Sequence, residues 1–336
     1  MNDVAVIVLN WNGKDVLKPC LDSLLAQSLH CGVFVVENGS SDGSLEYLRE
    51  NYPQVQLIIN KVNLGFAGGA NCGIREAIRR HFDYVALLNN DAYADKHWLK
   101  NLISILDDQP EAGIVTCKLI HADKLRLDST GDQYTVWGLP FPRGRGEPVS
   151  TKYDQKTNIF AASGGASAYR LKMIEEIGLF DEDFFAYYED VDISFRAQLA
   201  GWKVSYAADA LAYHQIGASS SRVRGFTTFQ TIKNLPWLVI KDVPKGLLHT
   251  VWPRFLLAHA MFLGRAILRG HAWSAFKGLA VSLQKIPKKL GERRVIQSKR
   301  TVSSSYISSM LTHDLPPNAS NLRKLRSWWW NIRGKK

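Results

Sequence analysis

The sequence predicts an α/β fold with a mostly parallel sheet, followed by a basic helical region. Within residues 3–120, short apolar runs alternate with amphipathic stretches, which is the pattern of β-α-β units. The first run, residues 4–9, is apolar and largely β-branched, as expected of a strand covered on both faces. With 336 residues, 46% hydrophobic and 22% charged, the chain can bury a large core and is neither disordered nor fibrous.

The individual elements follow from local periodicity and from the residues that end helices. Strands are predicted over residues 4–9, 33–36, 56–59, 84–88 and 209–213. Helices are predicted over residues 17–25, 44–50, 70–80, 96–106, 171–177 and 189–200. Residues 127–154 break into Gly, Pro and Arg and predict a mobile loop, and a regular pattern resumes at residues 159–169.

Charge is distributed unevenly along the chain. Residues 1–214 carry 20 Lys and Arg against 28 Asp and Glu, whereas residues 215–336 carry 22 against 3. The balances of −8 and +19 predict two regions with different roles, a catalytic domain over residues 1–225 and a basic helical region over residues 226–336. A strongly basic region favours a partner that carries phosphate, either nucleic acid or the anionic surface of a membrane.

Two features of the basic region favour the membrane. Arg254, Arg265 and Arg269 share one sector of a helical wheel that is otherwise mostly apolar. Residues 328–330 are three tryptophans among cations, an arrangement that is favourable at lipid headgroups. The same wheel also suits a helix packed on the catalytic domain with its arginines in water, and we keep both alternatives.

The sequence also bears on cellular location. No uncharged run reaches eighteen residues, so we expect no transmembrane helix, and the first apolar run lacks the cations and the length of a secretory signal. We therefore expect a cytoplasmic protein, peripheral on the inner face of the plasma membrane. Four scattered cysteines without nearby histidines are typical of reduced core thiols and not of a zinc module or a disulfide framework.

Polar residues follow the first two predicted strands. Asn10, Trp11 and Asn12 come after the first strand, and Glu37 comes after the second. The carboxyl ends of parallel strands form the edge at which open α/β folds bind ligands, and Glu37 could accept a hydrogen bond from the N–H of a base. The alternative is that residues 38–43 form only a turn and a helix cap.

A glycine-rich turn and a polar strand end come next. Residues 63–73 contain four glycines and precede a helix, so their backbone can approach a phosphate closely, although they match neither the dinucleotide nor the P-loop pattern. The apolar strand that ends near residue 88 is followed by Asn89, Asn90 and Asp91. One carboxylate can hold a divalent ion whose other ligands are phosphates, but a simple turn explains the same residues.

Three carboxylates crowd the start of the helix at residues 189–200. Glu189, Asp190 and Asp192 follow four aromatic residues, which form a plausible wall for a sugar and exclude water near a general base. The alternative is the helix dipole together with an i, i+4 pair between Asp192 and Arg196. His214, at a later strand end, is a candidate neutral metal ligand beside Asp91, although such a histidine is more often structural.

Together these motifs resemble the inverting glycosyltransferases of family 2, which have the Rossmann-like GT-A fold. The resemblance covers residues 3–225, and within the family it is strongest to rhamnosyltransferases that extend lipid-linked surface polysaccharides. The motifs that carry it are, in order, residues 10–13 (NWNG), 37–43 (ENGSSDG), 63–73 (NLGFAGGANCG), 89–91 (NND), 163–170 (SGGASAYR) and 189–192 (EDVD), with a later His214.

The resemblance implies a reaction and its partners. The donor is a nucleotide sugar, with L-rhamnose from dTDP-rhamnose as the first candidate and a UDP-hexose as the alternative. The acceptor is a glycan or lipid-linked saccharide, the cofactor is Mg or Mn, and nucleic acid is not a partner. The rival interpretations are a nucleic-acid or membrane-surface binding protein and a nucleotidyltransferase or dehydrogenase that uses the same strand ends.

The resemblance also implies roles for individual residues. Asp190 is the catalytic base, Asp91 the metal ligand, with His214 and Asn89 as further candidates, and Glu37 the residue that reads the pyrimidine. The remaining donor-side residues are Asn10, Trp11, Asn12, Asn63, Gly65, Phe66, Asn71 and Asn90. The acceptor-side residues are Gly164, Gly165, Tyr188 and Glu189. Two positions depart from the family pattern, since Glu37 is often Asp and Asn89 is often acidic.

Overall fold

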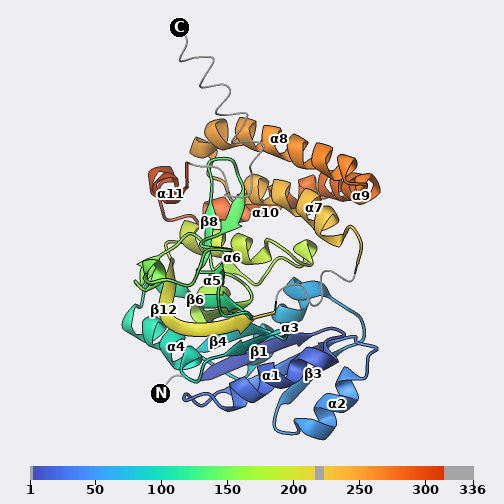
Figure 1. Cartoon of the computed structure of the whole chain (residues 1–336). Coiled ribbons are helices and arrows are strands. Elements are labelled where there is room, and N and C mark those ends of the chain that lie inside the picture. Colours follow the sequence, from blue (N-terminus) through green and yellow to red (C-terminus); the bar gives the residue numbers. More distant parts are fainter. Residues whose placement is uncertain (1–2, 216–222, 314–336) are drawn as a thin grey trace.

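The computed structural model describes residues 3–215 and 223–313, and the tryptophans at positions 328–330 lie outside the described residues. A twisted sheet covered by helices forms one part of the molecule, and a layer of C-terminal helices lies beside it (Figure 1). The sheet has the strand order β10-β12-β6-β11-β4-β1-β2-β3, with β5 paired to β12 and β7 paired to β6. The strands β1 to β4 are mutually parallel, and β11 runs antiparallel between β4 and β6.

The bounds of the elements agree with most of the predicted ranges. The strands are β1 (Val4–Asn10), β2 (Gly32–Asn38), β3 (Gln56–Asn60), β4 (Tyr84–Asn89), β5 (Ala92–Ala94), β6 (Ala112–His121), β7 (Leu127–Ser129), β8 (Asp132–Tyr134), β9 (Pro140–Pro142), β10 (Thr157–Asn158), β11 (Ala166–Arg170) and β12 (Lys203–His214). The helices before residue 216 are α1 (Lys14–Leu25), α2 (Ser44–Asn51), α3 (Gly65–Arg79), α4 (Trp98–Asp108), α5 (Leu171–Ile177) and α6 (Glu189–Leu199), with short 3-10 turns η1 (Thr151–Tyr153) and η2 (Glu182–Phe184).

Both faces of the sheet are buried, as the apolar first strand predicted. Val6 and Val8 of β1 point to the core that contains α1 and α4, whereas Ile7 points to the core that contains α3, α5 and α6. Alternate side chains of one strand therefore hold helices on opposite faces. This arrangement leaves the carboxyl ends of β1, β2 and β4 as one polar edge.

Two predictions for the middle of the chain were wrong. The ten-residue strand β6 was not predicted, although it is central to the sheet. The segment predicted as a mobile loop, residues 127–154, instead contains β7, η1 and the β8–β9 hairpin. It is ordered because many of its side chains are buried, including Asp128 and Tyr134, which a loop on the surface would not bury.

The C-terminal helices are α7 (Phe226–Lys241), α8 (Lys245–Leu268), α9 (Ala272–Gln284), α10 (Ile286–Ser298) and α11 (Ser304–Met310). They share one apolar core with the preceding part of the chain, in which Phe184 and Phe195 lie with Trp237 and Phe255. The predicted alternative of a helix packed on the catalytic part concerned α8, and its residues Val251, Phe255 and Ala258 do lie in this core. The core crosses the predicted domain boundary at residue 225.

Helix α8 differs from α7 because much of its apolar surface is exposed. Leu256, Leu257 and Leu268 are exposed on α8, as is Trp273 on α9. By length and composition, α8 is the one helix among the described residues that could cross a membrane, with 28% of its apolar window buried. The expectation of no such helix was therefore too strict, although α8 carries Arg254 near its middle and packs against α7, α9 and α11.

Candidate active site

The ends of β1, β2 and β4 are joined by buried side chains. Asn10 Nδ2 donates to Glu37 Oε2 over 2.7 Å, and the main-chain N–H of Ser40 donates to Glu37 Oε1 over 2.8 Å. Asn90 Nδ2 donates to Asn10 Oδ1 over 2.9 Å. A Cβ on Gly13 would lie 2.2 Å from Asn90 Nδ2, so glycine leaves room for this amide. The structure thus brings the predicted residues together, and Glu37, only 2% exposed, also braces the edge.

The loop after β2 is both a turn and part of the predicted donor edge. The main-chain N–H of Asn12 donates to Ser40 Oγ over 2.8 Å, and Asn12 Oδ1 accepts from the Ser41 N–H over 2.7 Å. Asp42 accepts from the Ser44 N–H, a turn bond just before α2, whereas the N-cap position itself is Gly43 and has no side-chain cap. Trp11 lies half-buried beside Asn12.

The glycine-rich segment is mostly helix. Helix α3 begins at Gly65, which has φ +73°, so the first turns include residues predicted as a turn before residue 70. Asn38 Nδ2 donates to Asn63 Oδ1 and to the Gly65 carbonyl, both over 3.0 Å, and the Gly65 N–H donates to Asn63 Oδ1 over 2.8 Å. These bonds fix the N-terminal end of α3 beside the end of β2. Such a helix end favours phosphate through its main-chain N–H groups and its dipole.

Two predicted donor residues of α3 lie in different surroundings. Asn71 is 1% exposed, and its amide donates to the Phe180 carbonyl and to Glu182 Oε1, both over 2.9 Å. It therefore ties α3 to η2, and its buried amide is directed away from solvent. Phe66 is partly exposed, and its ring would lie 3.2 Å from a Cβ on Gly164, which places it near the loop before β11.

Asp91 and His214 face each other at the ends of β4 and β12. His214 Nε2 lies 3.0 Å from Asp91 Oδ1 and 3.5 Å from Asn89 Nδ2. The other ring nitrogen, Nδ1, lies 2.7 Å from Oδ2 of Asp128, a residue that the sequence did not single out. Burial disfavours a charged ring, but the bonds to Asp128 and Asp91 outweigh it and raise the pKa of His214 to about 9.

This donor set fits a divalent ion. A carboxylate, an imidazole and an amide oxygen suit Mg or Mn when phosphate oxygens complete the coordination. Asp128 would hold Nδ1–H and leave Nε2 of His214 for the ion, which is the usual arrangement of a metal-binding histidine. Asp91 and His214 would therefore hold the ion, with Asn89 beside them, and the ion would neutralise charge on a diphosphate.

Asp190 lies at the start of α6, partly open to solvent. Its Oδ2 accepts from the Gly164 N–H and its Oδ1 from the Val191 N–H, both over 2.8 Å. Gly165, the neighbour of Gly164, accepts from the Asn89 N–H over 2.9 Å. These two adjacent glycines therefore connect the Asp190 carboxylate to the end of β4. The structure thus brings the predicted base near the predicted metal ligands.

Three carboxyl groups gather on this side of α6: the buried Asp132 and Glu189 and the partly exposed Asp190. Burial raises the pKa of Asp190, and burial together with the charge of Asp190 raises the pKa of Asp132 and Glu189 well above their usual values. The main-chain N–H donors favour the ionised form of Asp190, but desolvation outweighs them. A carboxylate with a raised pKa is a better proton acceptor at neutral pH.

The chain enters α6 through a strained loop. Phe185, Tyr187 and Tyr188 have φ values of 64°, 69° and 74°, a region that costs non-glycine residues roughly 1–3 kcal/mol each. The loop is pressed against α3, because the Ala67 N–H donates to the Phe185 carbonyl over 3.2 Å. A Cβ on Gly65 would lie 2.4 Å from that carbonyl oxygen, so glycine is required there.

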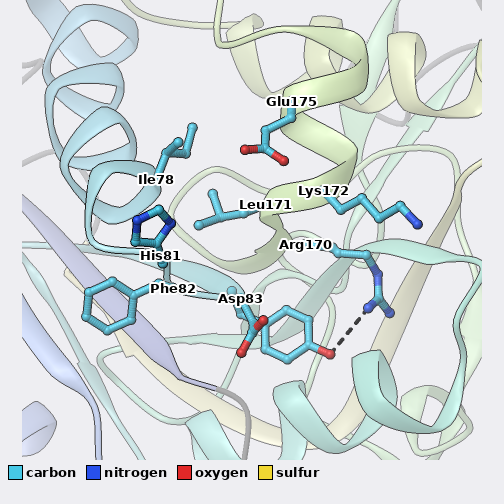
Figure 2. A pocket seen from close by; sticks show the side chains of 9 residues that line it. Ile78, His81, Phe82, Asp83, Arg170, Leu171, Lys172 and Glu175 are labelled. Carbon is cyan, nitrogen blue, oxygen red and sulfur yellow. Dashed lines mark hydrogen bonds between the residues drawn. The ribbon is translucent and has the colours of Figure 1, made fainter.

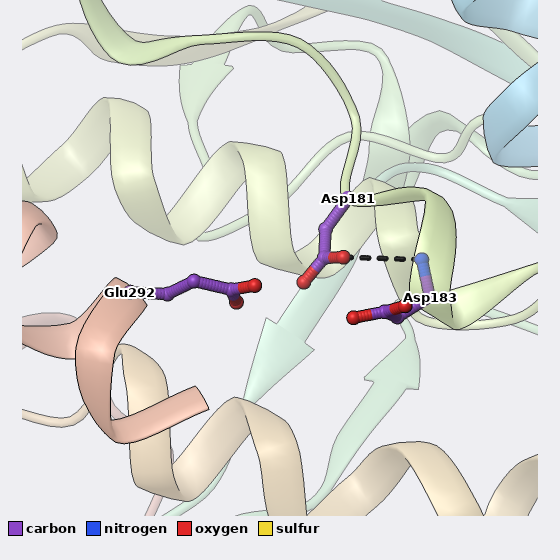
Figure 3. A group of neighbouring side chains, drawn as sticks. All are labelled: Asp181, Asp183 and Glu292. Atoms are coloured by element: carbon purple, nitrogen blue, oxygen red, sulfur yellow. Dashed lines mark hydrogen bonds between the residues drawn. The ribbon is translucent and has the colours of Figure 1, made fainter. Parts of the chain in front are cut away.

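A second group of carboxylates is not a metal site in this structure. Asp181, Asp183 and Glu292 point toward one another in Figure 3. The ammonium group of Lys289 lies among them, at 2.6 Å from Asp181, 2.8 Å from Asp183 and 3.0 Å from Glu292. A cation of the protein itself therefore neutralises this group, which fastens α10 to η2.

The hollow drawn in Figure 2 lies at the opposite edge of the sheet. His81, Asp83, Arg170 and Glu175 are among its lining residues, at the start of β4 and the end of β11. The Arg170 guanidinium is bonded to main-chain carbonyls of α4 and of the residues that follow it. This hollow is therefore separate from the carboxyl edge that holds the candidate site.

Sequence reasoning missed three charged residues of the site. Asp128, Asp132 and Arg145 all lie in the segment predicted as a loop. Arg145 pairs with Asp128 Oδ1 over 2.8 Å, and its charge acts on Asp190 and Asp132. The one sequence signal for these residues is that charged side chains are frequent in a segment rich in Gly and Pro. That signal does not identify their partners, because a partner such as His214 is far away in sequence.

Comparison with known proteins identifies the family. The profile of "Glycosyltransferase like family 2" matches residues 2–234. An N-acetylglucosaminyl-diphospho-decaprenol L-rhamnosyltransferase of Mycobacterium tuberculosis is 27% identical over 246 residues, which are 66% of this chain and 79% of that protein. The O-antigen chain rhamnosyltransferase RfbN of Salmonella typhimurium is 24% identical over 216 residues, 63% of this chain and 66% of that protein.

Solved structures show the same fold. The mannosyltransferase PcManGT of Pyrobaculum calidifontis, in complex with GDP-Man and Mn²⁺, superposes with a TM-score of 0.52 at 16% identity and covers 89% of this chain and 88% of that one. S. aureus TarS 1–349, in complex with UDP, superposes with a TM-score of 0.53 at 14% identity and covers 94% of each chain. The chain therefore belongs to glycosyltransferase family 2 and is an inverting enzyme with the GT-A fold.

Proposed function

We propose that this enzyme transfers L-rhamnose from dTDP-rhamnose to a lipid-linked glycan during synthesis of a cell-surface polysaccharide. The observation that carries the proposal is Asp190, a partly accessible carboxylate with a raised pKa that lies next to Gly164, as does Phe66 in the first turn of α3. The names of the Mycobacterium and Salmonella relatives support rhamnose as the sugar, and the first also supports a polyprenyl-diphosphate acceptor. A UDP-hexose is the alternative donor.

The reaction is a single displacement with inversion. The acceptor hydroxyl oxygen bonds to the anomeric carbon while the bond from that carbon to the diphosphate oxygen breaks. The bonding electrons leave with the nucleoside diphosphate, and the hydroxyl proton passes to the Asp190 carboxylate. Donors at the start of α3 stabilise the leaving diphosphate. Asp91 and His214 would hold a divalent ion, which would supply positive charge to neutralise the diphosphate.

We assign the other predicted residues to the two sides of this reaction. Asn10, Glu37 and Asn90 brace the nucleoside edge, which Trp11 and Asn12 border, and Asn63 and Gly65 set the phosphate end. Gly164 orients Asp190, and Gly165 connects it to Asn89. Phe66, Tyr188 and Glu189 lie around the acceptor side, whereas Asn71 supports α3 from behind.

We further propose that α8 and α9 rest on the cytoplasmic face of the plasma membrane. Both helices belong to the C-terminal layer, away from the sheet (Figure 1), and both carry exposed apolar residues. Arg254 and Arg265 of α8 and Arg269, which directly follows α8, are also exposed. Several lysines that gave this region its basic balance, among them Lys241 and Lys289, are buried in ion pairs and are not available to phosphate. The remaining cations still favour an anionic leaflet, and the apolar face favours insertion.

The donor is tested with a panel of nucleotide sugars. Transfer to a polyprenyl-diphosphate-linked N-acetylglucosamine should occur with dTDP-rhamnose and Mg or Mn, and dTDP-rhamnose should give the largest thermal stabilisation. Efficient transfer from a UDP-hexose and none from dTDP-rhamnose would replace the proposed sugar. Product whose anomeric configuration matches the donor would contradict the displacement.

The membrane contact is tested by sedimentation with vesicles that contain anionic lipid. The protein should bind, and high salt should release part of it. Changing Leu268 and Trp273 to Ser should weaken binding, whereas Leu125→Ser, an equally exposed apolar residue of the catalytic part, should not. Binding that is equal in all three proteins would remove α8 and α9 from the contact.

A further inference from the structure

Helix α7 lies against the loop that leads to Asp190. Thr227, Thr231 and Asn234 share one face of α7 because they are four and three residues apart. The Tyr187 hydroxyl lies 3.4 Å from Thr227 Oγ1, and Thr231 is hydrogen-bonded to the Tyr188 side chain. One face of α7 thus contacts successive residues of the loop that precedes α6.

Asn234 makes the most extensive of these contacts. Its amide Nδ2 lies 3.0 Å from the Phe184 carbonyl, 2.9 Å from the Ala186 carbonyl and 2.8 Å from the Tyr187 carbonyl, and the residue is 0% exposed. Three carbonyls that converge on one donor require the backbone to turn back on itself. The positive φ values of Phe185 and Tyr187 produce that turn.

Lys233 holds the start of the same loop. Its Nζ donates to the Asp183 carbonyl over 2.9 Å and to the Phe184 carbonyl over 3.1 Å, and it is 4% exposed. Burial lowers the pKa of Lys233 to about 8, with neighbouring acids opposing the shift. A buried ammonium group needs hydrogen-bond partners, so these two carbonyls are held in place by Lys233.

The opposite side of the loop touches the donor side of the site. The Phe185 carbonyl accepts from the Ala67 N–H at the start of α3, and Gly65 leaves the space for that approach. The loop is therefore held between α3 and α7, and its last residue, Tyr188, immediately precedes α6 and Asp190. A shift of the loop would move the carboxylate relative to the Gly164 N–H and to the donor.

We propose that Asn234, supported by Lys233, is a positioning residue for Asp190, so that the C-terminal region is part of the catalytic apparatus as well as a membrane contact. This inference rests on the proposed role of Asp190 as the base. Loss of the Asn234 amide lets the strained loop relax, which turns the start of α6 and weakens the Gly164–Asp190 bond. Turnover then falls while the donor, held by the strand ends, still binds.

The test compares Asn234→Ala with Gln297→Ala in the full-length enzyme. Gln297 is a matched control, because its amide also donates to two main-chain carbonyls, those of Lys241 and Asp242, but to none of the loop before α6. In Asn234→Ala we expect kcat to fall about 10- to 100-fold, dissociation constants for dTDP to change less than about threefold, and the acidic limb of the pH profile to move. Gln297→Ala should keep kcat within about twofold, even if it lowers the melting temperature.

A second variant covers the case in which Asn234→Ala does not fold. Lys233→Met keeps the size of the side chain, removes a costly buried charge and should fold, with kcat reduced about 3- to 10-fold. Full kcat in folded Asn234→Ala, or in Lys233→Met if the first variant does not fold, would overturn the proposal. Asp190→Asn is assayed in parallel. If Asp190→Asn keeps its turnover, the assignment of Asp190 as the base fails. If Asp190→Asn is inactive and Asn234→Ala is fully active, only the positioning role of Asn234 is refuted.

Discussion

Asp190 and Asp192 lie two residues apart on α6 and have opposite surroundings. Asp190 is bonded by main-chain N–H groups, and burial raises its pKa. Asp192 is fully buried, but Lys241 at 2.6 Å and Arg196 at 2.8 Å outweigh burial and lower its pKa. The two carboxylates point to different sides of the helix, one toward the candidate site and the other toward the C-terminal helices. The comparison shows how one helix separates a reactive carboxylate from a structural one.

The largest effect should come from exchanging each carboxylate for an amide. Asp190→Asn should lower kcat by about 10²- to 10⁴-fold, the usual worth of a general base, because the amide cannot accept the hydroxyl proton. Stability and donor affinity should change little, because the amide keeps the shape of the side chain. Asp192→Asn should show the reverse, with turnover of the folded protein retained and a lower melting temperature. Steady-state kinetics and thermal unfolding measure both, and more than about a tenth of wild-type turnover in Asp190→Asn would exclude it as base.

Removing Lys241, the cation beside Asp192, should have the next largest effect. It should lower the free energy of unfolding and not the turnover. Lys241 lies between Asp181 and Asp192 and is almost fully buried. Lys241→Met leaves these carboxylates without their ammonium partner, and breaking a buried pair typically costs about 3–5 kcal/mol of unfolding free energy. Lys18→Met, which breaks the exposed pair with Asp22, is the control and should leave stability unchanged. Equal denaturant midpoints for the two variants would mean that the buried network does not hold α7 to α6.

This difference between the two carboxylates could not be predicted from sequence. Helical spacing placed Asp192 near Arg196, which the structure confirms, but Lys241 lies in another helix and has no local signature. The strands and helices around the first core were predictable because their apolar residues recur with a regular period. Asp128 was missed because its partner His214 is 86 residues away, and its own segment, rich in Gly and Pro, has no period.

Asp91 lies between these two cases, because its partner is the imidazole of His214 and not a main-chain N–H, as for Asp190, or a lysine or arginine, as for Asp192. If Asp91 and His214 hold the divalent ion, Asp91→Ala should reduce Mn-dependent affinity for dTDP by at least about tenfold, because the ion that bridges the protein to the diphosphate loses its carboxylate ligand. Calorimetry of dTDP with Mn and with EDTA measures the effect. Asp95→Ala, at a partly exposed carboxylate directly after β5, is the control. Unchanged Mn dependence in Asp91→Ala would place the ion elsewhere.

The acid dependence of stability should separate the two kinds of carboxyl group. Burial opposes ionisation of Asp183, but Lys288 and Lys289 outweigh it and lower its pKa to about 2. Its contribution to stability is complete above the unfolded pKa, near about 4, and is lost as the pH falls toward 2. For Asp132 and Glu189, whose pKa is raised, the sign is reversed, and the folded state gains stability as the pH falls toward about 4.

We therefore expect the unfolding free energy to rise slightly from pH 7 toward about 5 and to fall steeply below about 4. Denaturant titrations across this range measure it. Asp183→Asn should remove part of the fall, and Glu189→Gln should remove part of the rise. Curves for both variants that run parallel to wild type would contradict the assignment of the two groups.

The smallest effect concerns Arg145, the cation that acts on the reactive side of α6. Its Nε donates to the Asp128 carbonyl over 3.0 Å, and its charge lowers the pKa of Asp190, although burial has the larger and opposite effect. Removing a nearby cation disfavours the ionised carboxylate, so Arg145→Gln should raise the pKa of Asp190 further. The acidic limb of the pH profile of kcat should then move to higher pH while the plateau is retained. Arg143→Gln is the matched control, because Arg143 stacks on Tyr153 and Tyr206, and it should leave that limb in place. A shift to lower pH, or equal shifts in both variants, would show that the acidic limb belongs to a group other than Asp190.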